Sequence, residues 1–298
     1  MSLVRSLEAP LAKTLVIRPG FSFLQPFVNE YVSGCILRFA TVNSCRMTSR
    51  KLLFTSFFLL AFQLSQGQQS TFLTEQLRYA RVKSAKENCA SEWKSTLKKH
   101  QIEEKKLTLF IRAFKQEGSL ELWGKNKEDA SFQLLRSYKV CAKSGTLGPK
   151  VQQGDGQVPE GVYSIDRFNP ASSYYLSLGL SYPNNIDKAR SAEKAPGGDI
   201  FIHGECVTIG CLPMTNEKIE EIYLLAVMAK SAGQSTIGVH VFPFRMEKGQ
   251  MELALKTTEG KKWGAFWKNL QSVYRYFEDT KTPGTWIKGE GISYKRKV

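Results

Sequence analysis

The chain has 298 residues, of which 42% are hydrophobic and 23% are charged. These fractions are typical of a soluble globular protein and exclude a chain too polar to bury a core, so we expect one large or two ordinary domains. The 42 basic residues outnumber the 27 acidic ones and give a formal net charge of +15.

The N-terminal part reads as an export signal behind an unexplained leader. Met47 precedes the basic stretch TSRK and an apolar run at 52–64 that is too short to span a bilayer, and Ser65 and Gly67 supply small residues for a cleavage site. We therefore expect a signal peptide at 47–67, with a buried core helix or a membrane anchor as alternatives. Because 1–46 shows no helical or strand period, we expect an over-extended start and translation from Met47.

A cleaved signal predicts an exported protein of the periplasm or cell envelope. The polyanions available there to a basic surface are the cell wall and anionic lipid head groups, rather than nucleic acid. Two of the six cysteines precede the signal, which leaves Cys89, Cys141, Cys206 and Cys211. Four are too few for a disulfide-framed fold, and whether Cys89 pairs with Cys141 is open.

The first folded part, 68–105, is predicted to be an N-terminal helical extension. Apolar residues recur at helical spacing from Phe72 to His100 among many charged ones, so we expect one amphipathic helix packed on the main domain.

The main domain, 106–246, shows mainly strand patterns. Alternating apolar residues predict strands at 107–114, 119–123, 132–140, 162–165, 174–180 and 237–242. The glycine-rich stretch 143–161 matches no nucleotide-binding pattern. The stretch 181–198 reads as a long polar loop of the kind that often carries function.

Two further helices are predicted. Thr215 is a suitable N-cap for a helix that ends before Gly233. In the C-terminal segment, 247–298, the stretch 262–283 has aromatic residues at helical spacing, which indicates an amphipathic helix packed on the main domain.

The stretch DIFIHGECVTIGC at 199–211 carries the candidate chemistry. His203 follows an apolar strand, and Cys211 follows Gly210 shortly before the Thr215 helix, where the helix dipole can stabilise a thiolate. The two side chains have the parts of a nucleophilic Cys–His site. They are also compatible with an ordinary strand histidine and buried cysteine, or with a zinc site that adds Cys206 and His240 but lacks a Cys-x2-Cys knuckle.

HGECVTIGC resembles the active-site motif of the L,D-transpeptidase (YkuD) family. The resemblance is closest to the YafK-like branch, which is similar at 147–163, 178–190, 241–246 and 266–280. Such a resemblance implies a mainly β (α+β) fold, a sandwich-like catalytic β domain with peripheral helices, and acyl transfer on peptidoglycan stem peptides without a cofactor or metal. A wall-linked lipoprotein is a further implied partner.

Carried over by position, Cys211 would be the nucleophile and His203 the proton acceptor and donor. Gly210 would help to form the oxyanion hole with the Cys211 N–H, while Thr208 and Gly204 would support the loop. The similarity at 178–190 also makes substrate-binding candidates of Tyr182, Asn184, Asp187 and Arg190.

The chain departs from the family pattern after Thr208. Ile209 replaces a second histidine, and LPM at 212–214 lacks an arginine found shortly after the cysteine of most members. His240, in an alternating strand, is a rival base but fits an exposed or hydrogen-bonded strand histidine better. Transfer to an amine, hydrolysis that cleaves L,D cross-links or detaches wall-linked protein, and a non-catalytic wall-binding module all remain open.

Overall fold

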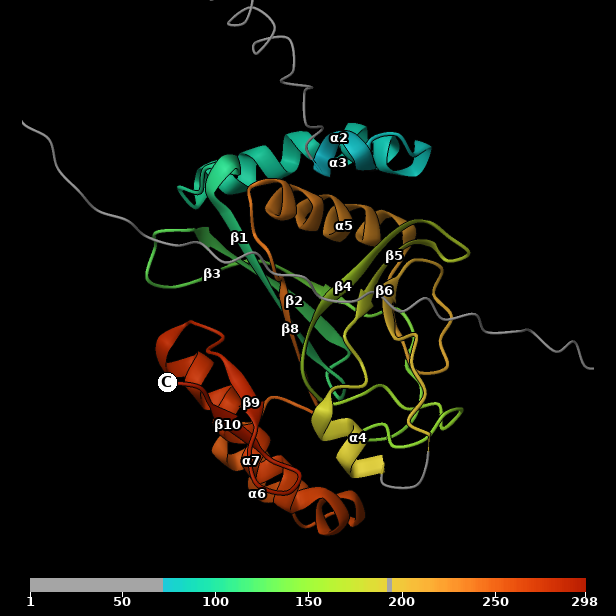
Figure 1. Ribbon diagram of the computed structural model, residues 1–298, viewed down its shortest axis with the longest axis vertical. Helices are drawn as coiled ribbons and strands as arrows, with labels where there is room; N and C mark the ends of the chain where they lie inside the picture. Colours follow the sequence, from blue (N-terminus) through green and yellow to red (C-terminus); the bar gives the residue numbers. More distant parts are fainter. Residues whose placement is uncertain (1–71, 192–194) are drawn as a thin grey trace, which may run out of the picture. The chain divides into compact units, whose positions relative to one another are not determined.

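A computed structural model describes residues 72–191 and 195–298, which belong to one compact unit, Gln66–Val298 (Figure 1). The predicted leader at 1–46 and signal peptide at 47–67 lie outside the described residues. Within the described ranges, no helix is both long and apolar enough to cross a membrane. The predicted boundaries after 105 and 246 remain a proposal.

An eight-stranded sheet forms the centre of the unit, with strand order β3-β2-β1-β8-β4-β5-β6-β7. Its strands are β1 (Leu107–Phe114), β2 (Ser119–Asn126), β3 (Gln133–Lys139), β4 (Gly161–Ser172), β5 (Tyr175–Leu180), β6 (Phe201–His203), β7 (Leu212–Pro213) and β8 (Gly238–Phe242). The predicted β-strands at 107–114 and 119–123 form the antiparallel hairpin β1–β2, and β3 extends it to a meander.

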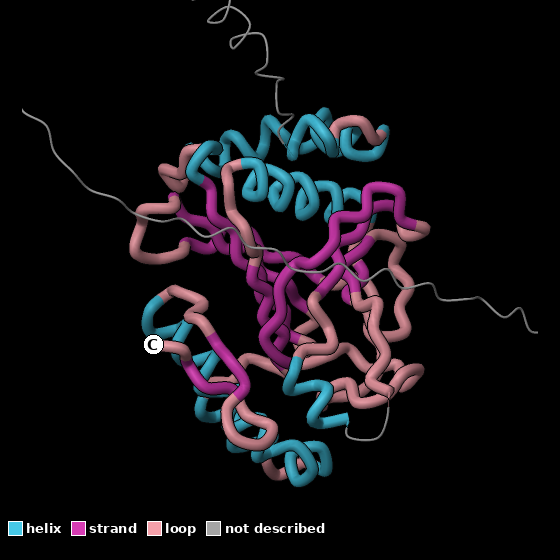
Figure 2. The backbone as a smooth tube through the Cα atoms, in the orientation of Figure 1, coloured by secondary structure: helices cyan, strands magenta, loops and turns pink. Residues whose placement is uncertain are grey.

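The long strand β4 joins two halves of the sheet. Its first residues, Gly161 to Ser164, pair with β8, and its later residues pair with β5. Register shifts after Ile165 and Asn169 interrupt the β4–β5 ladder, and irregularities of this kind bend a strand. The sheet therefore curls, and peripheral helices cover it, which confirms the mainly β (α+β) class (Figure 2).

One face of the sheet is covered by α5 (Asn216–Ser231), which lies between the sheet and α3 (Ala80–Lys99) (Figure 1). This buried position explains the unbroken apolar stretch of α5 from Ile222 to Ala229. The predicted N-cap is confirmed, because Thr215 Oγ1 accepts a hydrogen bond from the Lys218 N–H at 3.4 Å. On the other side of α5, the indole of Trp93 donates to the carbonyl of Glu221 at 2.9 Å and fixes α3.

The prediction of one helix over 72–100 is wrong, since α2 (Phe72–Gln76) precedes α3 as a separate helix. The N–H groups of Arg78 and Tyr79 bond to carbonyls three residues back, which tightens the end of α2. Tyr79 then takes an extended conformation and starts α3.

The C-terminal segment packs on the opposite face of the sheet. It consists of α6 (Lys248–Ala254), α7 (Thr258–Thr280) and a hairpin of β9 (Trp286–Lys288) with β10 (Tyr294–Arg296), and Figure 1 shows it apart from α3 and α5. The helix α7 begins earlier than predicted because Thr257 Oγ1 caps the Gly260 N–H at 3.0 Å. Its buried aromatic stripe includes Phe266, Trp267 and Phe277.

The interpretation of 181–198 as a loop is wrong for its middle part, which forms α4 (Asn185–Ser191). The Asn184 side-chain oxygen accepts from the N–H groups of Ile186 and Asp187 at 2.8 and 3.0 Å, so it caps the helix start. The polar composition of the segment hid a short helix of about two turns that depends on this cap.

Arg112 of β1 connects the sheet to α7. Its Nε and Nη2 atoms contact Glu121 Oε2 at 3.1 and 2.8 Å, and its Nη1 contacts Glu278 of α7 at 2.7 Å. The guanidinium also lies 4.3 Å from the ring centre of Phe277. The side chains of Arg112 and Glu121 are nearly fully buried. Removal of either one would therefore leave the charge of the other buried without a partner, which strongly destabilises a fold.

We therefore expect Arg112→Met to lower the free energy of unfolding by about 3–5 kcal/mol, since it leaves the Glu121 carboxylate buried without its main partner. Chemical denaturation measures this loss. Lys106→Ala removes the exposed pair with Glu103 and is the matched control, with an expected change below about 1 kcal/mol. Equal effects of the two substitutions would contradict the anchoring role of Arg112.

Candidate active site

The short strands β6 and β7 bring His203 and Cys211 to one face of the sheet. They pair in parallel, with Ile202 opposite Leu212 and His203 opposite Pro213. Ile202 and Leu212 are buried in the main core. Side chains alternate along a strand, so His203 and Cys211 project to the other face, with their Cα atoms about 8 Å apart from strand spacing and rise.

The imidazole of His203 is held in one tautomer. Its Nδ1 lies 2.6 Å from the carbonyl oxygen of Gly204, and because a carbonyl only accepts, Nδ1 carries the proton. The ring also packs against Tyr174, with 4.7 Å between ring centres. Burial lowers the pKa of His203, although the bond to Gly204 offsets part of this effect. The neutral ring therefore presents Nε2 as a base.

The thiol of Cys211 is half-buried and interacts with the backbone of the preceding strand. Its Sγ accepts from the Phe201 N–H at 3.4 Å and lies 3.7 Å from the Asp199 carbonyl oxygen, toward which the S–H can point. Burial raises the pKa of Cys211, and the Phe201 N–H offsets this only in part. The resting residue is thus a thiol, not the thiolate of a preformed ion pair with His203.

Thr208 organises the turn before Cys211. Its Oγ1 accepts from the N–H groups of Gly210 and Cys211 at 3.1 and 2.8 Å, and donates to the Cys211 carbonyl at 3.0 Å. These two N–H groups are the ones expected to bind an oxyanion. In this structure the hydroxyl oxygen of Thr208 takes that position, so an oxyanion would have to replace it.

Both glycines of the motif stand where a side chain would collide. Gly210 has φ +139°, and a Cβ there would lie 3.0 Å from the Gln157 carbonyl oxygen. A Cβ on Gly204 would lie 2.5 Å from the Asn216 side-chain oxygen, which accepts from the Glu205 N–H. The glycines therefore allow the 204–210 loop to lie close against its neighbours.

A disulfide between Cys141 and Cys206 ties this loop to the end of β3. Cys89 therefore does not pair with Cys141, which answers the question that the sequence left open, and it is a free, buried thiol in α3. The Cys141 N–H also bonds to the carbonyl of Pro213, the last residue of β7, at 3.0 Å. The zinc alternative loses a ligand, because Cys206 is no longer a thiolate.

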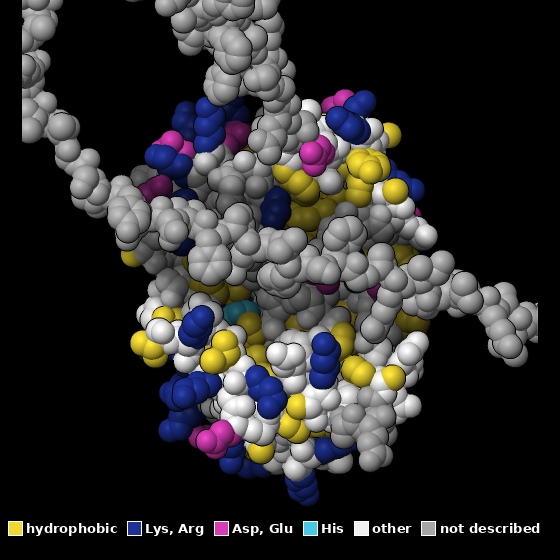
Figure 3. Space-filling model, in the orientation of Figure 1, with side chains coloured by type: hydrophobic (Ala, Val, Ile, Leu, Met, Phe, Trp, Pro, Cys, Tyr) yellow, Lys and Arg dark blue, Asp and Glu magenta, His cyan; other side chains and the backbone are white. Residues whose placement is uncertain are grey.

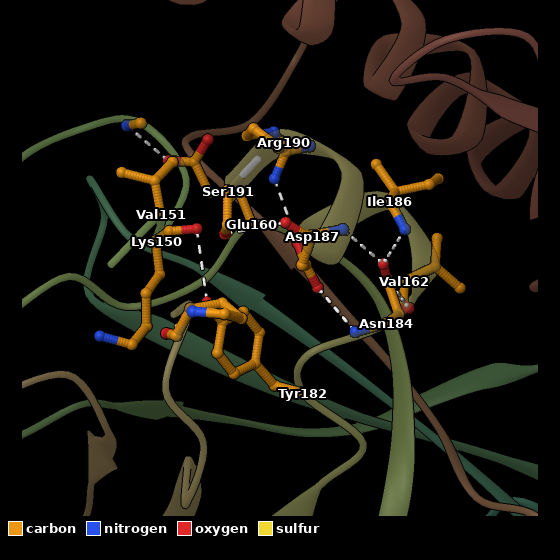
Figure 4. Close-up of polar contacts among 12 residues, drawn as sticks. Lys150, Val151, Glu160, Val162, Tyr182, Asn184, Ile186, Asp187, Arg190 and Ser191 are labelled. Carbon is orange, nitrogen blue, oxygen red and sulfur yellow. Dashed lines mark hydrogen bonds and ion pairs between the residues drawn. The ribbon is translucent and has the colours of Figure 1, made fainter. Parts of the chain in front are cut away.

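Three of the four substrate-binding candidates of 182–190, namely Asn184, Asp187 and Arg190, form a polar network around α4, whereas Tyr182 bonds elsewhere (Figure 4). Asp187 accepts from the Asn184 N–H at 3.0 Å and from Arg190 Nη1 at 3.1 Å. Asn184 Nδ2 donates to the Val162 carbonyl at 3.1 Å, and the Tyr182 hydroxyl donates to the Pro196 carbonyl at 3.0 Å. Most of these polar groups thus hold α4 in place.

His240 lies away from this site. It is buried on β8 between Phe110 and Phe242, so its assignment as an exposed or hydrogen-bonded strand residue is wrong. Burial, with help from Arg112, lowers the pKa of His240 to about 3 and keeps the ring neutral. Among the described residues, no group of three or more His, Cys, Asp or Glu side chains is arranged to hold a metal ion.

The amino-acid sequence of this chain is similar to those of known proteins. The family model of the YkuD L,D-transpeptidase catalytic domain matches residues 111–240. The Escherichia coli K12 protein named Putative L,D-transpeptidase YafK is 41% identical over 179 residues, which cover 59% of this chain and 69% of YafK. The chain belongs to the L,D-transpeptidase family. The same figures hold for YafK of Escherichia coli O157:H7.

Two solved structures are similar to this L,D-transpeptidase-family chain. The helical cell shape determining protein Pgp2 of Campylobacter jejuni is 19% identical with a TM-score of 0.37, over 61% of this chain and 72% of Pgp2. Bd1075 of Bdellovibrio bacteriovorus is 20% identical with a TM-score of 0.33, over 57% of this chain and 62% of Bd1075. The family match ends at 240, so α6, α7 and the final hairpin lie beyond it.

Sequence reasoning missed two features of the site. Tyr174 precedes β5 and packs against the His203 ring in a tilted arrangement, but nothing in the local pattern distinguishes it from the adjacent Tyr175. The Cys141–Cys206 bond joins positions 65 residues apart, and spacing along the chain does not reveal such a pair. The position of Cys206 inside the loop between His203 and Cys211 was the only available signal.

The disulfide yields a stability prediction. We expect Cys206→Ser to lower the free energy of unfolding by about 2–4 kcal/mol, because the unfolded chain regains the entropy that the cross-link removed. Denaturation under non-reducing conditions measures it. The double variant Cys141→Ser with Cys206→Ser is expected to lose the same amount, and an additive loss would mean that the two residues act separately.

The protonation states yield a pH prediction. Only the thiolate reacts with iodoacetamide, and the raised pKa of Cys211 keeps that form scarce at neutral pH. The alkylation rate is therefore expected to rise about tenfold per pH unit from about pH 7 to about pH 9. Intact mass with time measures it, and Cys211→Ala is the control for other thiols. A plateau reached below pH 7 would instead indicate a thiolate–imidazolium pair.

Proposed function

We propose that the protein is a cysteine acyltransferase of the exported cell-wall machinery that acts on diaminopimelate-containing peptidoglycan stem peptides. Family membership supports a peptidoglycan-related role. The observation that carries the reaction is the fixed tautomer of His203, which leaves Nε2 as a base on the same sheet face as the Cys211 thiol.

The reaction begins with removal of the thiol proton. His203 Nε2 takes the proton from Cys211 Sγ as the sulfur attacks the carbonyl carbon of a diaminopimelate residue at an L,D junction. The developing oxyanion takes the place of Thr208 Oγ1 on the N–H groups of Gly210 and Cys211, so that the same two donors serve both states.

Collapse of the tetrahedral intermediate completes acyl transfer to the enzyme. The carbon–nitrogen bond breaks, the protonated His203 gives its proton to the departing amine, and a thioester on Cys211 remains. An acceptor amine then gives transpeptidation, whereas water gives hydrolysis of cross-links or release of wall-linked protein. A neutral resting pair suits this cycle, because His203 must accept a proton first and donate it later.

Intact mass spectrometry of the protein incubated with a stem tetrapeptide tests the proposal. The expected result is an adduct of the tetrapeptide minus its terminal D-alanine, absent in Cys211→Ala and formed at least about a hundredfold more slowly in His203→Ala. An adduct that only amines discharge identifies a transferase, and one that water discharges identifies a hydrolase. Absence of adduct and of product from the folded protein would contradict the proposed chemistry and favour a wall-binding module.

A further inference from the structure

The turn between β4 and β5 lies beside the candidate base. Tyr174 of this turn packs against the imidazole of His203, with 4.7 Å between the ring centres and 40° between the ring planes. The Tyr174 carbonyl oxygen also accepts a hydrogen bond from the Gly204 N–H at 3.1 Å. Tyr174 therefore contacts both the ring of the base and the residue whose carbonyl oxygen fixes its tautomer. None of the acyl-transfer steps requires the Tyr174 side chain directly.

Tyr174 covers one side of the His203 ring. Tyr174 is 48% exposed and His203 is 2% exposed, so the tyrosine has one side in water and the other against the imidazole. Aromatic contacts with ring centres about 4.5 to 7 Å apart stabilise one relative orientation of the two rings. The tyrosine can therefore both orient the imidazole and keep water from it.

The basicity of His203 depends on this cover, because charged side chains do not determine it. Burial lowers the pKa of His203, the bond to the Gly204 carbonyl offsets part of this effect, and no charged group contributes. The flanking strands place Ser177 and Pro213, which do not ionise, opposite His203. The segments next to it carry these ionisable side chains: Tyr174, Glu205, Cys211, Glu217 and Lys218. Access of water is thus the main variable that controls the proton affinity of the ring.

Arg81 of α3 holds the turn that carries Tyr174. Its Nη1 donates to the carbonyl oxygens of Ser172 and Tyr175 at 2.5 and 2.6 Å, on either side of Tyr174. Its Cζ lies 5.3 Å from the centre of the Tyr175 ring. Tyr175 has φ +67°, a left-handed conformation that residues with a side chain rarely adopt and that surrounding contacts must hold. The guanidinium thus clamps both ends of the turn in the conformation in which Tyr174 meets His203.

The N-terminal helices and α5 anchor the same hairpin at further points. The Tyr175 hydroxyl donates to Glu220 of α5, and the other oxygen of Glu220 accepts from Asn88 of α3 at 2.8 Å. Phe72 of α2 packs edge-on against Phe168 of β4, with 4.9 Å between the ring centres. Figure 3 shows hydrophobic side chains gathered on the visible face between these N-terminal helices and the β4–β5 hairpin. The turn is therefore tied to α3, which lies before the residues that the family model matches.

We propose that Tyr174 is a positioning residue for the base: its ring orients the imidazole of His203 and keeps water from it, and Arg81 holds Tyr174 in this place. The contacts are those of the structure, whereas the consequence for catalysis rests on the proposed role of His203 as the base. A helix outside the matched residues thereby takes part in arranging the candidate active site.

Nuclear magnetic resonance titration of His203 in the Cys211→Ala protein tests the cover. We expect Tyr174→Ala to raise the pKa of His203 towards that of a free imidazole, because water then reaches the ring. Tyr174→Phe keeps an aromatic ring in the same place and is expected to leave the pKa of His203 unchanged. The signals of His100 and His240 in the same spectra are internal references and are expected to stay as they were.

Arg81→Gln tests the clamp. It is expected to raise the pKa of His203 in the same direction but by less than Tyr174→Ala, since the turn is then free to move away from the ring. Combined with Tyr174→Ala it is expected to add no further shift, because Arg81 acts through Tyr174. Lys83→Gln, at an exposed position of the same helix, is the matched control and leaves the pKa unchanged. Fully additive shifts would overturn the role of Arg81.

The pH profile of adduct formation on Cys211 links the contact to the reaction. With a stem tetrapeptide, the acid limb of the profile reports the neutral form of His203, so a higher pKa moves this limb to higher pH. Tyr174→Ala is expected to show this movement and an adduct rate at neutral pH at least about tenfold lower, because small displacements of a base are costly. Tyr174→Phe is expected to restore both.

An unchanged His203 titration in folded Tyr174→Ala protein would overturn the proposal, as would the absence of nuclear Overhauser contacts between the rings of Tyr174 and His203 in the unsubstituted protein. The Overhauser measurement and Arg81→Gln decide the matter even if Tyr174→Ala fails to fold. Normal adduct formation together with an unchanged titration overturns the positioning role alone. A shifted titration without any adduct, even from the unsubstituted protein, contradicts the proposed acyl transfer alone.

Discussion

The parallel pairing of β6 with β7 is the interaction on which the candidate site depends. It is only two residue pairs long. It nevertheless determines which side chains enter the core and which lie on the face of the sheet that carries His203 and Cys211. Ile202 and Leu212 bind the two strands to the main core, and this burial offsets the small number of ladder hydrogen bonds. His203 and Cys211 are then placed by alternation alone, without a direct contact between them.

The rest of the fold supports this short pairing from both sides. α5 starts three residues after β7 with a capped N-terminus and packs on one face of the sheet, while the ion pair of Arg112 with Glu278 holds α7 to the opposite face. Rigid elements thus surround a loop whose own conformation depends on Thr208 and two glycines. Precise placement of a nucleophile generally requires such support, because small displacements are costly for catalysis.

Sequence reasoning succeeded where local patterns determine the outcome. The Thr215 helix, the β1–β2 hairpin and the strand that ends at His203 follow from capping and alternation. The role of Cys211 rests on the family motif and stays a prediction. Sequence reasoning failed where residues distant in the sequence decide, as for the Cys141–Cys206 bond and the burial of His240 between Phe110 and Phe242. Periodicity does not record such contacts. It also missed α4, whose start depends on a local cap by the Asn184 side chain.

The disulfide also poses a problem of chemical selectivity during assembly. The correct bond requires Cys141 to join Cys206 and not Cys211, although the two are only five positions apart in the chain. Disulfide formation proceeds through the thiolate, and burial keeps Cys211 protonated once β6 and β7 have paired. Burial of Cys211 therefore also slows its oxidation, so that the folded environment itself distinguishes the sulfur of the candidate nucleophile from the two sulfurs that form the disulfide.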